Sequence, residues 1–399
     1  MKTFRQLFWK INRWGVRLVL RRKFNVRLHE SADPLPKAPY VVISNHANFF
    51  DPWIVGHYTT EPIAIMMNEF GFKASAMTRW YLRNVGCFSK KKGQSDAQSV
   101  KRAMKSLRAG YTLLVFPEGQ ASWSGKTQPI YPGIERITKK VKAPLVLYRL
   151  RGNFVSKPWW STGPARKGEI TVFRKVISAQ EVTERTADEL RQEICSFIQH
   201  NDVKACADVS FSGTDITAGM EMVLWYCPHC HSRNTLKMDK NTVRCDTCGT
   251  EKVFTPNLQI EAPAPKEPRD FYDWYKAQTE LVQQDLSAIS STPDRHLIHD
   301  SHVSQVKVDY KGRVIMLDTG ELDLYGNTLV FSGQDGVQTF PLADLFHPVF
   351  QGKNILEFDC NNSDYQFRFT HTALSQWLSY LLYLKGYGDW ERTGYIFQQ

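Results

Sequence analysis

The chain has 399 residues, of which 42% are hydrophobic and 23% are charged, so we expect about two to four globular domains and exclude a disordered or collagen-like protein. Its formal net charge of +11 indicates an anionic partner, and the candidates are nucleic acid, a membrane surface and a phosphorylated substrate. We expect neither a transmembrane helix nor a signal peptide, because no apolar run is long enough for the first and the start of the chain lacks the pattern of the second.

The positive charge is concentrated near the start of the chain. Residues 1–110 contain 20 Lys and Arg against 6 Asp and Glu, a net charge of +14, whereas the remaining 289 residues sum to −3. The anionic partner is therefore expected to meet the first quarter of the chain.

Residues 1–30 are predicted to form an amphipathic helix at a membrane interface. Eight basic residues and no acidic residue lie within residues 1–23, and the apolar residues recur at helical spacing, namely Phe4, Leu7, Phe8, Ile11, Trp14 and Leu18. Trp9 and Trp14 are of the aromatic type that settles at a membrane–water boundary. We therefore expect peripheral binding to an anionic membrane surface, and the alternative is a basic helix that packs on its own domain.

Residues 31–205 have the pattern of an α/β domain. Short apolar runs rich in β-branched residues predict buried strands at residues 40–44, 111–116, 144–148 and 169–176. One helix is expected to begin at Asp51-Pro52, where Asp is a favoured N-cap and Pro a favoured first residue, and others to span residues 96–110 and 186–200. Strands that alternate with helices indicate a sheet flanked by helices.

Residues 222–258 are predicted to form a zinc ribbon. Two Cys-x-x-Cys units are separated by fourteen residues, and their thiolates belong to Cys227, Cys230, Cys245 and Cys248. Four thiolates complete the tetrahedral shell of a structural Zn²⁺, so His229 and His231 are not expected to be ligands. Cysteines with metal spacing are typical of a reducing compartment, and we expect the protein at the cytoplasmic face of a membrane.

The last part of the chain is predicted to be a linker followed by a small β domain. Residues 259–290 combine a Pro-rich stretch with a helix over residues 270–289. Residues 291–399 alternate apolar and polar residues in short runs and close with one helix that ends at Gly386. This order is similar to that of pleckstrin-homology-like barrels, and the chain shows no internal repeat.

The first predicted strand of the α/β domain is followed by a His-x4-Asp pair. His46 and Asp51 would not face each other on one continuous helix, but they can converge if Asp51 stands at a helix start and His46 in the loop before it. A carboxylate that accepts the Nδ1–H of a histidine fixes its tautomer and frees the other nitrogen to act as a general base. Without further context such a pair is common and is weak evidence for catalysis, and a loop histidine beside an ordinary N-cap aspartate is the favoured explanation.

The context of this pair is specific. Asn45-His46, Asp51-Pro52 and, about 65 residues later, Phe116-Pro117-Glu118-Gly119 resemble the glycerolipid (lysophospholipid) acyltransferase family, which includes bacterial 1-acylglycerol-3-phosphate acyltransferase. Residues 86–92 and 144–148 match two further blocks of that family, and the resemblance covers residues 1–205.

The resemblance implies an α/β acyltransferase domain with a mixed sheet flanked by helices. It implies transfer of a fatty acyl group from acyl-CoA or acyl-carrier protein to a hydroxyl of a lysophospholipid or related glycerolipid. His46 would deprotonate the acceptor hydroxyl, Asp51 would orient His46, and backbone N–H groups would stabilise the oxyanion.

The resemblance also assigns substrate contacts. Lys92, with Lys90 and Lys91, would bind an acceptor phosphate, while Glu118 and Gly119 would hold the glycerol end. The chain departs from the family at Ala121, where an arginine that contacts phosphate is usual, and at Lys92, which also replaces an arginine. These departures weaken the assignment of a simple lysophosphatidate and leave a glycolipid or another lysolipid open, and the alternative for residues 90–92 is a solvated basic loop.

Two other classes of function remain as alternatives. The protein could be a non-catalytic membrane-bound adaptor that recruits a protein partner through the zinc ribbon and the C-terminal domain. Nucleic-acid binding by the ribbon is not favoured, because residues 222–258 carry five basic and three acidic side chains without interleaved aromatic residues.

Overall fold

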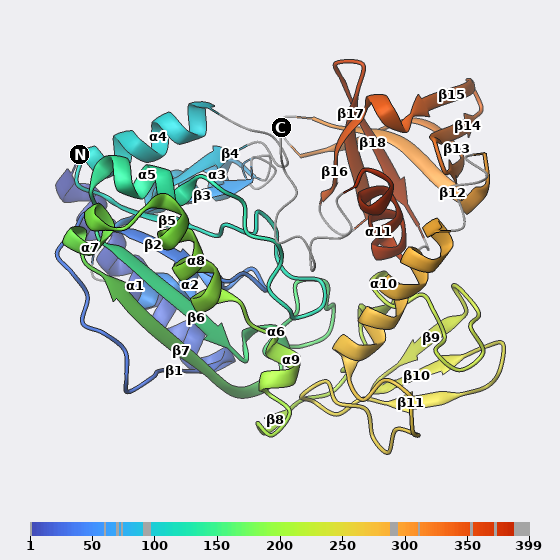
Figure 1. Cartoon of the computed structure of the whole chain (residues 1–399), viewed down its shortest axis with the longest axis horizontal. Helices are drawn as coiled ribbons and strands as arrows, with labels where there is room; N and C mark the ends of the chain where they lie inside the picture. The colour runs from blue at the N-terminus through green and yellow to red at the C-terminus, as the bar shows by residue number, and fades with distance from the viewer. Residues whose placement is uncertain are drawn as a thin grey trace. The chain divides into compact units, whose positions relative to one another are not determined.

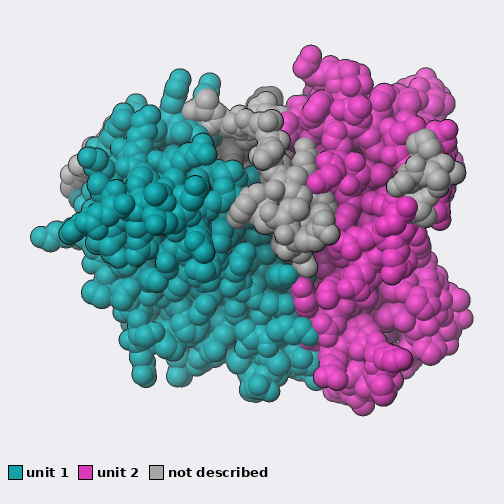
Figure 2. Space-filling view, viewed as in Figure 1, with its two compact units in different colours: residues 1–91, 95–214, 255–259 teal, residues 92–94, 215–254, 260–399 magenta. Residues whose placement is uncertain are grey.

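The computed structural model describes residues 2–59, 61–68, 72, 75–90, 97–287, 294–309, 312–351, 354–370 and 373–386. The chain forms two compact units, which are coloured separately in Figure 2. Unit 1 consists of residues 1–91, 95–214 and 255–259, and unit 2 consists of residues 92–94, 215–254 and 260–399.

Unit 1 is built on one mixed sheet, as the α/β pattern predicts (Figure 1). Its strands are β1 (Asn25–Leu28), β2 (Val41–Ser44), β3 (Ile63–Asn68), β4 (Cys87–Lys90), β5 (Thr112–Val115), β6 (Leu145–Arg151), β7 (Lys167–Ile177) and β8 (Phe211–Ser212). They lie in the order β1-β7-β6-β2-β5-β3-β4, with β8 paired to β7. The strands from β6 to β4 are mutually parallel, whereas β7 runs antiparallel to β6.

The helices of unit 1 cover both faces of this sheet. They are α1 (Lys2–Lys23), α2 (Asp51–His57), α3 (Ala76–Val85), α4 (Ala97–Arg108), α5 (Ile134–Val141), α6 (Asn153–Ser156), α7 (Ala179–Glu184), α8 (Ala187–Ile198) and α9 (Asp202–Ala205). Because both faces are covered, the central strands read as continuous apolar runs, and all four residues of β2 are buried. The predicted helix over residues 186–200 is α8, with Thr186 as N-cap in a capping box with Glu189.

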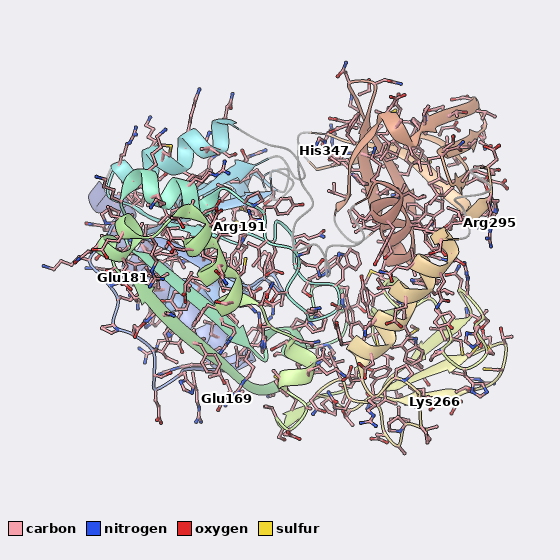
Figure 3. All side chains as sticks on the ribbon, viewed as in Figure 1. Glu169, Glu181, Arg191, Lys266, Arg295 and His347 are labelled. Carbon is pink, nitrogen blue, oxygen red and sulfur yellow. The ribbon has the colours of Figure 1, made fainter. Side chains whose placement is uncertain are left out.

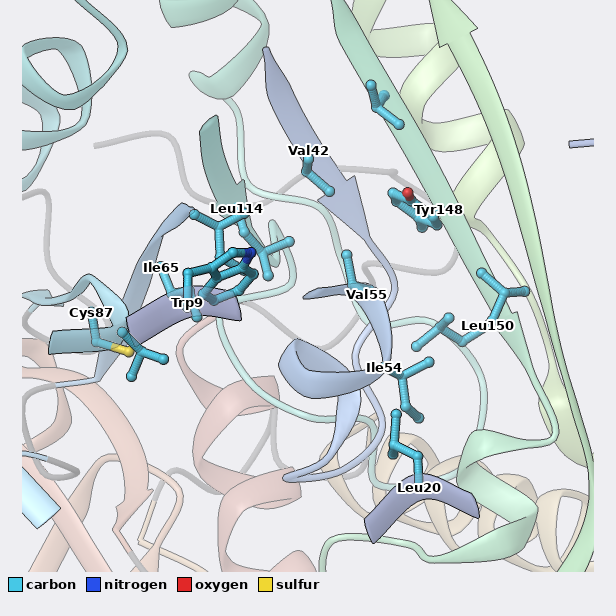
Figure 4. Close-up of a cluster of buried hydrophobic side chains, with 14 of the residues drawn as sticks. Trp9, Leu20, Val42, Ile54, Val55, Ile65, Cys87, Leu114, Tyr148 and Leu150 are labelled. Atoms are coloured by element: carbon cyan, nitrogen blue, oxygen red, sulfur yellow. The ribbon is translucent and has the colours of Figure 1, made fainter. Parts of the chain in front are cut away.

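The first helix differs from the prediction in two respects. It ends at Lys23, whereas the prediction extended it to residue 30, because residues 25–28 form β1 in parallel register with β7. Trp9, expected at a membrane boundary, is only 2% exposed and, like Leu20, belongs to the hydrophobic core of unit 1 (Figure 4). A Cβ placed on Gly56 of α2 would lie 3.2 Å from the Trp9 indole, so the contact between α1 and α2 is close.

The opposite face of α1 remains exposed and apolar. Phe4, Leu7, Ile11 and Trp14, which belong to the predicted apolar face, are 57–66% exposed. The helix therefore combines a buried face that holds it on unit 1 with a solvent-facing apolar stripe.

Unit 2 contains the cysteine-rich module, a long helix and a seven-stranded antiparallel sheet. The cysteine-rich module has the strands β9 (Leu236–Asp239), β10 (Thr242–Cys245) and β11 (Glu251–Val253), and α10 (Phe271–Ser287) follows it. The larger sheet comprises β12 (His296–Val308), β13 (Val314–Tyr325), β14 (Thr328–Gly333), β15 (Gly336–Pro341), β16 (Leu345–Gln351), β17 (Ile355–Cys360) and β18 (Ser363–Phe369), with α11 (Leu374–Leu384) after it. Antiparallel strands followed by one helix match the predicted element order of residues 291–399, and likeness to pleckstrin-homology-like barrels stays a prediction.

Helix α10 ties the cysteine-rich module to the rest of unit 2. The Gln278 side chain accepts hydrogen bonds from the backbone N–H groups of Trp225 and Tyr226 and donates to the Val223 carbonyl. The Arg233 guanidinium bonds both carboxylate oxygens of Asp285 at 2.8 and 3.0 Å. Polar contacts of this kind, buried at Gln278 and partly buried at Arg233, fix the position of the module on the helix.

Candidate active site and metal centre

The candidate active site lies at the carboxyl edge of the parallel strands. β2 pairs in parallel with β5 and β6, so the loops that follow these strands leave the sheet at one edge. The Asn45 side chain pins the loop after β2 to β6, because it accepts from the Leu150 N–H at 2.8 Å and donates to the Leu150 carbonyl at 3.0 Å. Open α/β sheets bind their ligands at this edge.

His46 and Asp51 come together in this loop. His46 Nδ1 lies 2.8 Å from Asp51 Oδ2, and the same oxygen accepts hydrogen bonds from the backbone N–H groups of Ala47 and Asn48 at 2.5 and 2.8 Å. Asp51 is the first residue of α2 and is completely buried, while Phe50 occupies the N-cap. The predicted N-cap role of Asp51 is therefore wrong, because its carboxylate points back into the loop and holds His46 and the loop backbone instead.

The imidazole of His46 faces the accessible side of this loop. Its ring stacks on Phe116 at 4.4 Å between centroids with an angle of 29°, and its side chain keeps 22% of its surface exposed. Among the residues that the structure describes, none makes a hydrogen bond to Nε2. The ring is therefore fixed by Phe116 on one side and Asp51 at Nδ1, and Nε2 is available to a substrate hydroxyl.

Asn153 is a site residue that the sequence analysis missed. Its Nδ2 donates to Asp51 Oδ1 at 3.1 Å, and its backbone carbonyl accepts from Asn48 Nδ2 at 2.8 Å. It stands first in α6 and is fully buried. It lies 102 residues from Asp51 in the chain, so no local pattern links the two residues.

The α6 turn is itself held by a buried carboxylate. Asp202 accepts from the backbone N–H groups of Gly152, Phe154 and Val155 at 2.5–3.1 Å, and it lies 3.0 Å from His200 Nε2. This arrangement fixes the backbone on both sides of Asn153. Asn153 thereby presents its amide to Asp51 from a rigid support.

Glu118 joins the two loops of the site. Oε1 accepts the His46 backbone N–H at 2.6 Å, and Oε2 accepts the Gln128 N–H at 2.6 Å, with the residue 2% exposed. Burial raises the pKa of Glu118 well above its usual value, although the two backbone hydrogen bonds act in the opposite direction. In this structure Glu118 positions the backbone of His46, and its predicted contact with the glycerol end of a substrate stays a prediction.

The remaining predicted substrate residues fall in two places. Gly119 is exposed beside Glu118 with φ of +71°, and a Cβ there would lie 3.0 Å from the Tyr131 ring, so glycine fits this turn. Lys91 and Lys92 lie outside the described residues, and for Lys90 only the backbone, at the end of β4, is described. Beside Ala121, the Ser122 N–H donates to the His46 carbonyl at 2.9 Å, which adds a second backbone hydrogen bond to the loop that carries His46.

A family model described as Acyltransferase matches residues 24–148, a range that includes His46, Asp51 and Glu118. This match and the relative described next support the assignment of residues 24–148 to the glycerolipid acyltransferase family. The resemblance inferred from the sequence motifs is thus confirmed, and the domain carries the mixed sheet and the histidine loop just described.

The similar proteins are distant. A chloroplastic 1-acyl-sn-glycerol-3-phosphate acyltransferase of Brassica napus is 25% identical over 142 residues, which are 35% of this chain and 41% of the relative. The chain therefore spans about two fifths of the length of that relative. The crystal structure of the 1-acyl-sn-glycerophosphate acyltransferase PlsC from Thermotoga maritima has a TM-score of 0.44 and 18% identity, covering 51% of this chain and 81% of that one. The C-terminal domain of an unknown protein from Leishmania infantum has a TM-score of 0.18 and 13% identity, covering 27% of this chain and 95% of that one.

The four cysteines of the two Cys-x-x-Cys segments converge in unit 2. All four Sγ atoms lie within 4.8 Å of one another, and the pairs Cys227–Cys248 and Cys230–Cys245 are 3.9 and 3.6 Å apart. A tetrahedral Zn²⁺ with bonds of about 2.3 Å needs sulfur atoms about 3.8 Å apart, whereas a disulfide needs about 2.05 Å. The four thiols therefore fit a zinc ion and are not arranged as disulfides.

The two Cys-x-x-Cys segments have equivalent backbone hydrogen bonds. In each segment the carbonyl of the first cysteine accepts from the N–H of the fourth following residue, and the N–H of that cysteine donates to the carbonyl of the fifth following residue, all at 2.9 Å. The fourth residues, His231 and Gly249, both have positive φ, at 64° and 73°. Two matching knuckles of this kind present four sulfur atoms to one point, while the His229 and His231 side chains lie outside the four-cysteine cluster.

Proposed function

We propose that this protein transfers a fatty acyl group from acyl-CoA or acyl-carrier protein to a hydroxyl of a lysophospholipid or related glycerolipid. The observation that carries the proposal is the pairing of His46 Nδ1 with the buried carboxylate of Asp51 at 2.8 Å, within an acyltransferase-family domain. The exposed side of the His46 ring provides the access that such a reaction requires.

The proposed reaction needs one proton carrier. His46 Nε2 takes the proton of the acceptor hydroxyl while the oxygen forms a bond to the thioester carbonyl carbon of the donor. The tetrahedral oxyanion then collapses, the carbon–sulfur bond breaks, and the departing thiolate takes the proton back from His46. Asp51 holds the neutral tautomer and stabilises the imidazolium between these steps. General base catalysis of this kind contributes about 10²–10⁴ in rate.

The substrate contacts proposed for this reaction follow from the family resemblance. Lys90, Lys91 and Lys92 bind an anionic group of the acceptor or of the donor, and Glu118 with Gly119 borders the glycerol end. Because Lys92 stands where arginine is usual, phosphate binding is less directional than a bidentate guanidinium would provide. The acceptor class is therefore proposed as lysophospholipid or related glycerolipid, not as lysophosphatidate alone.

We propose that the protein acts at an anionic membrane surface on the cytoplasmic side. The exposed apolar stripe of α1 continues onto α3, where Trp80 is 56% exposed and contacts Phe8 edge-to-face at 5.7 Å. Near the end of α1, a hollow of about 480 Å³ is lined mainly by basic residues, including Arg17, Arg21, Lys23, Arg27 and Lys167. No helix in the described part of the chain is long and apolar enough to cross a bilayer. An apolar stripe flanked by basic side chains supports interfacial binding.

We further propose that the four-cysteine cluster holds a structural Zn²⁺. Cys227, Cys230, Cys245 and Cys248 would fill the coordination shell, so this ion would stabilise the module without taking part in acyl transfer. Its role is distinct from that of the acyltransferase domain, and the module remains a candidate surface for a protein partner.

The experiment that tests the acyl-transfer proposal compares His46→Ala with His29→Ala. His29 is an exposed histidine of the same unit that bonds Ser31. Purified variants are assayed on vesicles with acyl-CoA or acyl-carrier protein and a panel of lysolipids. We expect wild type and His29→Ala to acylate one acceptor class, and His46→Ala to lose about 10²-fold or more in kcat with unchanged unfolding temperature.

The same assay can refute the proposal. Retained turnover in the His46→Ala variant would show that this histidine is not the general base. A wild-type protein that folds, binds vesicles and acylates no lysolipid with either donor would instead support the non-catalytic adaptor.

A further inference from the structure

Two histidines and one aspartate meet on the large sheet of unit 2. His296 Nε2 and His299 Nδ1 lie 2.7 and 2.9 Å from the same atom, Asp323 Oδ1. Single ligand atoms of the three residues all lie within 4.8 Å of one another. The cluster contains no cysteine and involves neither the four-cysteine centre nor the acyltransferase domain.

A bulge in β12 brings the two histidines to one face. Residues three apart on a regular strand point to opposite faces. Here His299 pairs with Asp323, Ile298 with Leu324 and His296 with Tyr325, so two steps along β12 match one step along β13. Because Asp323 and Tyr325 share a face of β13, their partners His299 and His296 share it too.

This face is the solvent side of the sheet. The side chains of His296, His299 and Asp323 are 46%, 42% and 19% exposed, whereas Ile298 and Leu324 between them are buried on the other side. With regular pairing, one of the two histidines would point into the core. The bulge turns it to the surface instead. Arg295, labelled in Figure 3, precedes His296 and marks the position of this end of β12.

We propose that His296, His299 and Asp323 form a second metal site, which binds a divalent late first-row transition ion such as Zn²⁺. Two imidazole nitrogens and one carboxylate oxygen are the donor set that such ions prefer, while Ca²⁺ and Mg²⁺ favour oxygen donors alone. Tetrahedral Zn²⁺ with bonds of about 2.0–2.1 Å requires donor atoms about 3.3 Å apart, so each histidine needs to move only about half an ångström from the Asp323 oxygen.

Three protein donors leave at least one coordination position open. That position is filled by water or by an exogenous ligand at the exposed surface. This feature distinguishes the site from the four-cysteine centre, whose shell is closed by protein sulfur atoms. The structure thus assigns two chemically different metal sites to unit 2, one closed and sulfur-rich, the other open and formed by nitrogen and oxygen.

The test measures zinc bound to the full chain. Wild type and variants are dialysed against the same buffered micromolar free Zn²⁺, and zinc per chain is measured by elemental mass spectrometry. We expect about two ions in wild type and about one in His296→Ala, His299→Ala and Asp323→Asn. His302→Ala is the matched control, because His302 is an exposed histidine of the same strand outside the cluster, and we expect it to keep both ions.

A titration of the chain already loaded at its cysteines gives the affinity. Each of the three cluster variants should bind the second ion about tenfold or more weakly, since one of three protein donors is lost. Co²⁺ provides an independent readout, because the second equivalent should lack the sulfur-to-metal absorption that cysteine ligands produce. One ion in the wild type, equal zinc in His296→Ala and wild type, or loss of the second ion in His302→Ala would each overturn the proposal.

Discussion

The two tryptophans of α1 offer a matched pair of substitutions with opposite expected effects. Trp9 is 2% exposed and packs against α2, whereas Trp14 is 66% exposed on the same helix. Trp9→Ala removes a buried side chain and should lower the free energy of unfolding by about 3–5 kcal/mol, which is roughly 6–20 °C in unfolding temperature. Trp14→Ala removes little buried surface and should change stability by about 0.5 kcal/mol or less.

Membrane binding should show the reverse order. An indole has about 200 Å² of surface, and if about half of it leaves water at the interface, the transfer free energy is about 2.5 kcal/mol. Allowing for partial insertion, Trp14→Ala should weaken partition onto anionic vesicles by about tenfold or more. Thermal unfolding and cosedimentation with vesicles of phosphatidylglycerol and phosphatidylcholine measure the two effects on the same preparations.

The outcome separates the two faces of the helix. Equal losses of stability in both variants would show that α1 does not bury Trp9 selectively. Unchanged vesicle binding by Trp14→Ala would show that the exposed stripe does not meet lipid, and the helix would then be a basic surface element of unit 1.

Three further substitutions test two buried side chains of unit 1 and the four-cysteine centre of unit 2. Because burial raises the pKa of Glu118, its contribution to stability is fully present below the usual carboxyl pKa and is lost as pH rises through the raised value. The Glu118→Gln variant lacks this titration. The difference in unfolding free energy between wild type and variant, measured by urea melts, should therefore shrink from about pH 5 to about pH 9. A difference that stays constant over this range would contradict the raised pKa of Glu118. Asn153→Ala removes a donor to the Asp51 carboxylate, which should cost about 1.5–3 kcal/mol of stability and lower kcat by about tenfold. Ser156 lies in the same helix as Asn153, and Ser156→Ala removes the hydrogen bond from its Oγ to the Arg166 carbonyl, so this variant should lose stability alone. Equal kcat in the Asn153→Ala and Ser156→Ala variants would leave Asn153 without a positioning role. Cys248→Ser should lose the zinc of the four-cysteine centre and lower the unfolding temperature, and a serine variant that retains its zinc under dialysis would argue against that centre.

Four strands of unit 1, namely β2, β5, β6 and β7, could be predicted from sequence, whereas β3, which lies between β5 and β4, was not predicted. Residues 40–44, 111–116 and 144–148 overlap β2, β5 and β6, since buried parallel strands appear as unbroken apolar runs, and residues 169–176 overlap β7. Strand β1 could not be predicted, because residues 25–28 directly follow a helical pattern and become a strand only through pairing with β7, more than 140 residues later. Its formation depends on pairing with the open edge of β7, which no local sequence pattern reveals.

The residues of the candidate site also divide into those that local sequence could identify and those that it could not. His46 and Asp51 belong to one short loop, so spacing and motif context suffice to pair them. Asn153 and the anchoring of α6 by Asp202 come from distant segments that the sheet brings to one edge. Glu118 also holds the backbone of two loops through both of its oxygens, a positioning role that the motif alone does not reveal.

The cluster on β12 and β13 shows that sequence spacing alone can hide residues that the fold brings together. His296 and His299 are three residues apart, and alternation along a strand would place them on opposite faces, so a sequence pattern gives no reason to connect them. One extra residue in β12 reverses the direction of every side chain before it relative to those after it. Since Ile298 still faces the core opposite Leu324, the bulge satisfies hydrophobic packing and leaves both imidazoles beside Asp323. Removing the extra residue should therefore separate the histidines, and metal binding at this cluster depends on the local register as much as on the three donors themselves.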